Sequence, residues 1–238
     1  MSGHSKWATT HRAKELTDAK RGNIFTKLSR NISIAARKGG DPEMNFSLFT
    51  AIEKAKTANM PKDNIEKAIK RGTGELEGAT LEQVMYEAFG SGGTALLIDG
   101  VTDNKNRTTS EVKLILTKHG GSFGAQNSVQ WMFAQKGVIR LDAADVKDKD
   151  TLMMELLDAG AQDVVEEEGG LTVYTGFIEF EKVKKWLDGN GVKPSYAEVE
   201  WIAKDKVPVD EETRGKVESL IDALDAYDDV NGVYCNMA

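Results

Sequence analysis

Residues 2–40 read SGHSKWATTHRAKELTDAKRGNIFTKLSRNISIAARKGG, and this stretch is strongly basic. It contains nine lysines and arginines against two acidic residues, a net charge of 9 − 2 = +7 in a protein whose formal net charge is −7. Residues 1–72 hold 15 basic and 7 acidic residues, or +8, whereas residues 73–238 hold 16 and 31, or −15. This division indicates that one part of the chain meets a polyanion and the remainder does not.

The length and composition allow one or two globular domains, and the charge division favours at least two. The 238 residues are 40% hydrophobic, which is enough for packed cores, and they contain no apolar run long enough to span a membrane. The polar, basic N-terminus does not resemble a secretory signal. Cys235 is the only cysteine, so no disulfide forms within the chain. We therefore expect a cytoplasmic protein with no membrane partner.

Apolar residues at helical spacing continue the basic stretch and predict a small three-helix unit over residues 12–72. We expect Gly22 to kink the first helix or to mark a break in it, and we expect Gly39-Gly40 to end it. Asn45 is a suitable N-cap for the second helix, and Pro61 suits the start of the third. The predicted inward-facing residues of the three helices are Ile24, Phe25, Leu28, Ile32, Ala35, Leu48, Phe49, Ile52, Ala55, Ile65, Ala68 and Ile69.

Strand signals begin after the linker TGELEGA at 73–79. Residues 84–89, 94–101 and 128–133 are predicted strands, with a helix over 103–119 that Asp103-Asn104 caps. Residues 137–204 then show a β-α-β-β-α-β order, the ferredoxin-like pattern. A helix over 210–226 and a strand over 232–236 have no partner in that unit, so we expect them to return and complete the earlier sheet.

The predicted fold class is therefore α plus α/β, with an N-terminal three-helix domain followed by two ferredoxin-like α/β domains, the second inserted in the first. We expect a basic all-α domain with its linker at 1–78. A middle α/β domain would comprise 79–134 and 206–238, and the inserted domain would comprise 135–205.

Catalytic, metal and cofactor signatures do not emerge from the sequence. His4, His11 and His119 have no cysteine near them, which argues against zinc. No phosphate-binding P-loop or nucleophile elbow is present, and the glycines at 90–93 and 120–124 are best interpreted as turns. We find no nucleophile, base and orienting group together, so we expect a protein that is not an enzyme and has no cofactor, metal or small-molecule substrate.

The candidate nucleic-acid-binding residues are cations of the N-terminal stretch, together with one tryptophan. Trp7 has two interpretations: it folds back onto the first helix, or it stacks on a base. The segment TDNKNRT at 102–108 also has two, a helix cap or a secondary contact through Asn104, Asn106 and Arg107. The main set comprises Lys6, Trp7, Arg12, Lys14, Lys20, Arg21, Lys27, Arg30, Arg37 and Lys38. We expect Lys20, Arg21, Lys27 and Arg30 to be hydrated in the free protein.

Several strings in this chain closely resemble the YebC/PmpR family, whose relatives include the mitochondrial translational activator of cytochrome c oxidase. They are GHSKW at 3–7, DAKRGNIFTKL at 18–28, KAKTANMPKDNIEKAIKRG at 54–72, YEAFGSGGTA at 86–95, TDNKNRT at 102–108, GGSFGAQNSVQWMF at 120–133 and KGVI at 136–139. The family usually has Pro where Ser91 stands and Gly where Asn127 stands. The resemblance implies a three-domain, DNA-binding transcriptional regulator.

Three functions remain open at this point. The first is a nucleic-acid-binding regulator of gene expression that acts on DNA, with the transcription machinery as a candidate partner. Some members of the family resemble translation factors that relieve stalling at proline-rich sequences, so the second is binding to the ribosome or its RNA. The third is a protein-interaction module without nucleic-acid contact. No recognition helix is apparent in the sequence, which weakens sequence-specific DNA reading.

Overall fold

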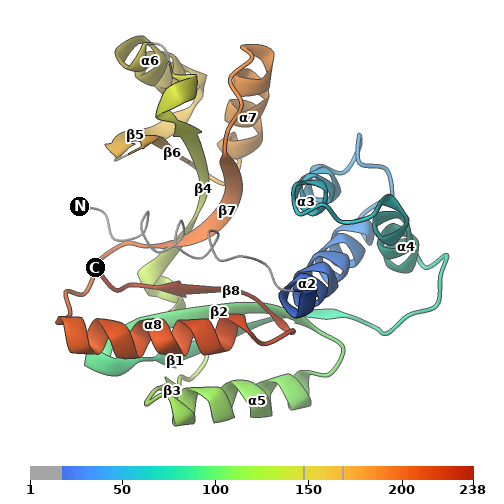
Figure 1. The fold of residues 1–238 in the computed structure, drawn as a ribbon, viewed down its shortest axis with the longest axis vertical. Coiled ribbons are helices and arrows are strands. Elements are labelled where there is room, and N and C mark those ends of the chain that lie inside the picture. Colours follow the sequence, from blue (N-terminus) through green and yellow to red (C-terminus); the bar gives the residue numbers. More distant parts are fainter. Residues whose placement is uncertain (1–17, 147, 168) are drawn as a thin grey trace. The chain divides into compact units, whose positions relative to one another are not determined.

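The computed structural model describes residues 18–146, 148–167 and 169–238, which form a mixed α/β fold (Figure 1). These residues contain seven α-helices and two four-stranded antiparallel sheets. They gather into two compact units, one from residues 131–206 with 238 and the other from residues 18–130 and 207–237. The mixed fold class is confirmed, whereas the division into three domains with boundaries near 78, 134 and 205 stays a prediction.

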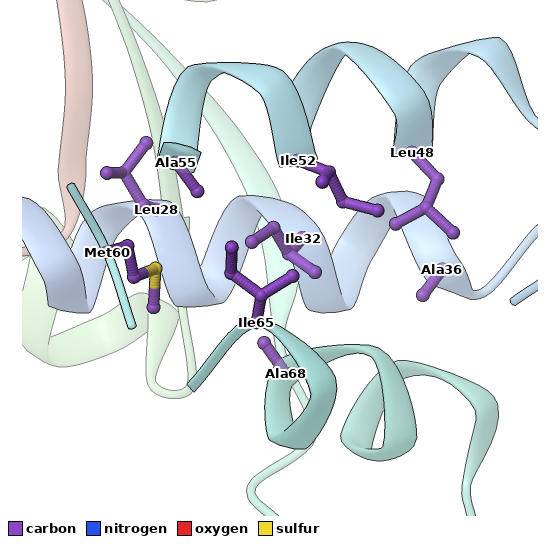
Figure 2. Packing of buried hydrophobic residues seen from close by; sticks show 9 residues of the cluster. All are labelled: Leu28, Ile32, Ala36, Leu48, Ile52, Ala55, Met60, Ile65 and Ala68. Atoms are coloured by element: carbon purple, nitrogen blue, oxygen red, sulfur yellow. The ribbon is translucent and has the colours of Figure 1, made fainter. Parts of the chain in front are cut away.

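The second unit begins with three helices around an apolar core. The predicted apolar stripes supply most of that core, because residues at 3.6 spacing face the same side of a helix. The prediction was wrong for Phe49, which is 38% exposed. No break occurs at Gly22: helix α2 runs through it, since one glycine costs a helix only about 1 kcal/mol. The helices are α2 (Asp18–Ala36), α3 (Phe46–Thr57) and α4 (Lys62–Thr73). Figure 2 shows the core side chains Leu28, Ile32, Ala36, Leu48, Ile52, Ala55, Met60, Ile65 and Ala68.

Asn45 joins the end of α2 to the start of α3. Its side chain accepts a hydrogen bond from the Leu48 backbone N–H at 3.1 Å, which confirms the predicted N-cap. Its amide Nδ2 also donates to the carbonyl oxygens of Ala35 at 2.8 Å and Gly39 at 2.7 Å. One buried side chain therefore satisfies backbone groups at two helix ends.

The first sheet has the strand order β3-β1-β2-β8, and helices α5 and α8 pack against it and against each other. Strand β8 pairs with β2, as expected for the C-terminal segment. The inserted segment lies, in chain order, between β3 and α8. The elements are β1 (Glu82–Phe89), β2 (Ala95–Thr102), α5 (Lys105–Lys118), β3 (Ser122–Phe123), α8 (Glu211–Asp225) and β8 (Val230–Cys235).

Two expectations for this sheet are wrong. Its connectivity is not ferredoxin-like, because the turn at residues 91–93 joins β1 directly to β2 as neighbouring strands. The strand expected over 128–133 is instead, as far as Met132, a loop and a short 3-10 turn. Buried Glu87 accepts hydrogen bonds from the backbone N–H groups of Asn127, Val129 and Gln130, which removes them from any ladder. Asn127 has a φ of 64°, a left-handed conformation that Asn adopts more readily than most residues.

The other unit holds the second sheet, whose strand order is β5-β6-β4-β7 with every neighbouring pair antiparallel. This order confirms the ferredoxin-like pattern predicted for it. Strand β4 is longer than expected and begins at Phe133. The elements are β4 (Phe133–Asp142), α6 (Lys149–Ala159), β5 (Ala161–Glu167), β6 (Gly170–Thr175), α7 (Glu179–Gly189) and β7 (Tyr196–Ala203). Among the described residues, no helix is long and apolar enough to cross a membrane.

Candidate nucleic-acid interface

Part of the predicted binding set lies beyond the region that the structure describes. Lys6, Trp7, Arg12 and Lys14 precede residue 18. Lys20 and Arg21 belong to α2, but the described side chains of this helix begin after them. The structure describes the remaining members of the set, which lie further along α2, directly after its end, and at the start of α5.

Lys27 and Arg30 are half-buried and bind other parts of the chain, whereas the sequence predicted freely hydrated cations. The Lys27 ammonium donates to the carbonyl oxygen of Asp225, and the Arg30 guanidinium donates to the carbonyl oxygen of Asp228 at 2.9 Å. Arg30 also forms an ion pair with the Asp229 carboxylate at 2.5 Å. The helical period places these cations off the apolar stripe, but it cannot show that a segment about 200 positions later covers them. We call that segment, residues 225–229, the acidic turn.

Asp229 is the centre of a buried polar network. Its residue is 2% exposed, and its carboxylate accepts from the hydroxyls of Thr108 at 2.6 Å and Thr102 at 3.0 Å. Arg107 forms an ion pair with Asp229 Oδ2 at 3.0 Å, whereas Arg30 pairs with Oδ1. Burial raises the pKa of Asp229, but the hydrogen bonds from Thr108 and Arg107 and the positive charge of Arg30 outweigh it and lower the pKa to about 2. The network thus connects α2 to the first sheet.

The segment at 102–108 forms a helix cap, the first of the two interpretations given for it. The Asn104 side chain accepts from the Arg107 backbone N–H at 3.1 Å and begins α5. The Arg107 guanidinium is shared between Asp103 at 2.6 Å and Asp229. Asn106 is exposed. A secondary contact of Asn104, Asn106 and Arg107 with a ligand stays a prediction, and Arg107 already has two carboxylate partners.

The exposed cations gather where α2 and α4 end. A Cβ on Gly72 would lie 2.6 Å from Ala36 Cβ, and one on Gly40 would lie 2.7 Å from Thr73 Cγ2, so the two helix ends are adjacent. Their side chains form no hydrogen bond or ion pair with the described part of the chain. We call this group the basic end, and it comprises Arg37, Lys38, Lys67, Lys70 and Arg71.

Sequence reasoning selected two members of the basic end, Arg37 and Lys38, and overlooked the three on α4. Lys67, Lys70 and Arg71 are spaced i, i+3 and i+4, on the side of the helix opposite buried Ile65 and Ala68. That spacing was the available signal, because residues so placed share one helix face. These three cations contribute to the charge of +8 over residues 1–72, but they were assigned no binding role from the sequence.

A hollow of about 300 Å³ adjoins the basic end. Arg37 and Arg71 line it together with Arg30 and Ser33, and the acidic side chains of Glu77 and Asp103 also border it. Guanidinium groups bind phosphate through paired N–H donors in a fixed plane. The hollow therefore offers two exposed guanidiniums and a third, Arg30, that the acidic turn already occupies.

Comparison with known families matches nearly all of this chain. Residues 5–75 match the family described as TACO1/YebC protein N-terminal domain, and residues 81–237 match the one described as TACO1/YebC second and third domain. The chain belongs to the TACO1/YebC family. This confirms the resemblance stated from the sequence strings.

Relatives within the TACO1/YebC family are similar along their whole length. A protein of Halothermothrix orenii named "probable transcriptional regulatory protein" is 50% identical over 99% of this chain and 94% of its own length. A protein of the same description from Thermoanaerobacter pseudethanolicus is 48% identical over 100% and 97%. The crystal structure of a conserved hypothetical protein from Aquifex aeolicus superposes with a TM-score of 0.85 at 44% identity, covering 95% of this chain and 94% of that one.

Proposed function

We propose that this protein is a non-enzymatic regulator of gene expression that binds nucleic acid through its helical domain, as a DNA-binding transcriptional regulator of the YebC type. The observation that carries the proposal is the basic end, five exposed cations on and just after two adjoining helices of a protein of net charge −7. Its relatives are named probable transcriptional regulatory proteins, which supports a regulatory role. The acidic remainder of the chain repels nucleic acid and so confines binding to this surface.

The basic end suits the phosphate backbone better than the base edges. Lys70 and Arg71 lie in the last turn of α4, where they also offset the negative end of the helix dipole. Phosphate contacts fix position and supply affinity, whereas base contacts supply sequence preference. We therefore propose backbone binding with modest sequence preference, a property that also suits ribosomal RNA, the target in the translation-factor alternative.

The test is binding of the full chain to a labelled 20-base-pair DNA duplex and to purified ribosomes across a KCl series. Arg37→Glu/Arg71→Glu should weaken binding at least ~30-fold at 100 mM KCl, because reversed charges repel phosphate. It should also flatten the slope of log K against log salt by about 1.5, near 0.7–0.9 for each phosphate that is no longer neutralised. Lys193→Glu/Lys206→Glu, exposed cations of the other unit, is the matched control and should change affinity by under ~3-fold.

The outcomes separate the alternatives. Duplex binding that the Arg37/Arg71 variant loses and the control keeps supports the DNA-binding regulator. The same pattern on ribosomes, without duplex binding, selects the translation factor. Unaltered affinity in the folded Arg37/Arg71 variant contradicts the proposed surface, and an absence of binding to either target selects the protein-interaction module.

A further inference from the structure

The acidic turn presents to α2 the same kind of acceptors that a phosphate backbone would present. Two carbonyl oxygens and one carboxylate of residues 225–229 receive the donors of Lys27 and Arg30. The segment reads DAYDD, so three carboxylates stand within five residues. Phosphodiester oxygens and these groups compete for the same N–H donors, because both are anionic or strongly polar oxygen acceptors.

The contacts of Arg30 and Lys27 with the acidic turn differ in strength. Arg30 meets a carboxylate that is itself fixed by Thr102, Thr108 and Arg107. Lys27 meets a backbone carbonyl, and burial lowers its pKa, although the charges of Asp225 and Asp228 act to raise it. A charged Lys27 is thus held in a partly desolvated place, which favours its exchange to a more strongly anionic partner.

The location of Arg30 connects the acidic turn to the proposed binding surface. Arg30 lines the same hollow as Arg37 and Arg71, whose guanidiniums are exposed. A strand held by the basic end would therefore bring further phosphates close to Arg30 at a high effective concentration. Asp229 keeps Arg107 and two threonine donors when Arg30 leaves, so the acidic turn need not unfold.

From these contacts we propose that the acidic turn is an internal competitor for nucleic acid, which displaces it from Lys27 and Arg30 on binding. This inference rests on the proposed function, because it concerns regulation of the same surface. The free chain is then held in a low-affinity state in which two cations of α2 are neutralised, and the bound chain gains these two cations as further phosphate contacts. Binding and release of the contact between α2 and β8 become coupled.

The first test neutralises the acidic turn while keeping its backbone carbonyls. Asp225→Asn/Asp228→Asn in the full chain is titrated with the labelled 20-base-pair duplex and with a labelled 20-nucleotide poly(U) across a KCl series. The variant should bind at least ~10-fold more tightly at 100 mM KCl, because the charges of Asp225 and Asp228 no longer attract Lys27. The slope of log K against log salt should steepen as Lys27 exchanges to a phosphate. Glu111→Gln/Glu155→Gln, two exposed acids elsewhere, makes the same change in net charge and should alter affinity by under ~3-fold.

The second test uses a disulfide to prevent α2 from separating from β8. The Asn231 Nδ2 atom donates to Asn31 Oδ1 at 2.8 Å, so Asn31→Cys/Asn231→Cys puts one thiol on each side of this contact. Only protein that mass spectrometry shows to hold a disulfide between α2 and β8 is titrated. Cys235→Ser serves as background, since it removes the only native cysteine. The oxidised protein should bind at least ~10-fold more weakly than the same protein after dithiothreitol, and each single-cysteine variant should show no redox effect.

The results distinguish the inference from the function on which it rests. If the wild-type chain binds and the acidic-turn variant gains no more than the Glu111/Glu155 control, the acidic turn does not compete and only the inference fails. Equal binding by the oxidised and reduced cysteine pair likewise overturns the inference. If the wild-type and the acidic-turn variant both fail to bind either nucleic acid at low salt, the proposed function fails and the inference fails with it.

Discussion

At the scale of single residues, Asp229 has the largest set of partners that the described part of the chain gives one carboxylate. It links Arg30 of α2 with Arg107 of α5, and its backbone oxygen accepts from the Val101 N–H at 2.9 Å. Removing a carboxylate from such a buried network leaves positive charges without a counter-charge, which costs more than the loss of an exposed pair.

Asp229→Asn should lower the free energy of unfolding by about 3 kcal/mol at pH 7, the range for breaking a buried ion pair. Because the pKa of this carboxyl falls from 3.8 to about 2 on folding, its contribution is present above pH ~4 and is lost as the pH falls toward 2. Urea unfolding at pH 7, 4 and 3 should therefore show the wild-type advantage shrinking with acidity. Asp103→Asn, which removes the more exposed partner of Arg107, is the control and should have a much smaller effect. An equal loss in both variants would contradict this account.

At the scale of elements, α2 and α4 approach closely because Gly72 has no side chain. A Cβ there would lie 2.3 Å from the Ser33 carbonyl oxygen, too close for any real atom. The Ser33 hydroxyl donates to the Ala68 carbonyl oxygen at 2.8 Å across the same contact. This close approach brings Arg37 and Lys38 beside Lys70 and Arg71 and so creates the basic end.

Gly72→Ala should therefore separate the two helices and lower the free energy of unfolding by about 2 kcal/mol, within the range for overpacking. It should also reduce nucleic-acid affinity, since the cations of α2 and α4 would move apart. Gly22→Ala in the exposed start of α2 is the matched control, because a Cβ there meets nothing within 4 Å. It should stabilise the protein slightly, by about 0.5–1 kcal/mol. Thermal unfolding and duplex titration of both variants measure the difference, and a Gly72 variant as stable as wild type would refute the argument.

At the scale of the whole molecule, the unit at residues 131–206 is an acidic insertion in the chain of the other unit. It has 10 basic and 16 acidic residues, or −6 of the total −7. The ends of the insertion lie together, because the Lys204 N–H donates to the Met132 carbonyl oxygen at 2.9 Å. A chain that leaves and re-enters a unit at neighbouring points can lose the insertion without breaking the unit's own sheet.

Replacing residues 131–206 by a short Gly-Ser linker should leave a folded protein that binds duplex DNA within ~3-fold of the full chain or more tightly. The expectation follows because β8 still pairs with β2, and the basic end and the acidic turn both remain. Circular dichroism and a single cooperative unfolding transition check the fold, and duplex titration checks the binding. A folded deletion protein that no longer binds would place the nucleic-acid surface in the insertion instead.

Much of this architecture follows from local sequence patterns. Apolar spacing on α2, α3 and α4 predicted three helices and most of their core, and Asn45 and Asn104 were identifiable as caps because their side chains act within three residues. The β-α-β-β-α-β order predicted the second sheet, and an unpartnered C-terminal helix and strand predicted the return to the first sheet. Such features depend on neighbours in the chain or on counting elements, both visible in one dimension.

The tertiary structure decided the features that depend on contacts between residues distant in the sequence. Glu87 draws residues 127–130 into a loop, and nothing near those residues in sequence shows that a carboxylate 40 positions earlier will capture their N–H groups. Lys27 and Arg30 have the spacing of solvated cations, yet the acidic turn neutralises them because β8 returns beside α2. The approach of two helices at Gly72 brings together cations from both. Hydrophobic periodicity specifies which face of an element is buried, whereas the pairing of charges depends on which faces finally meet.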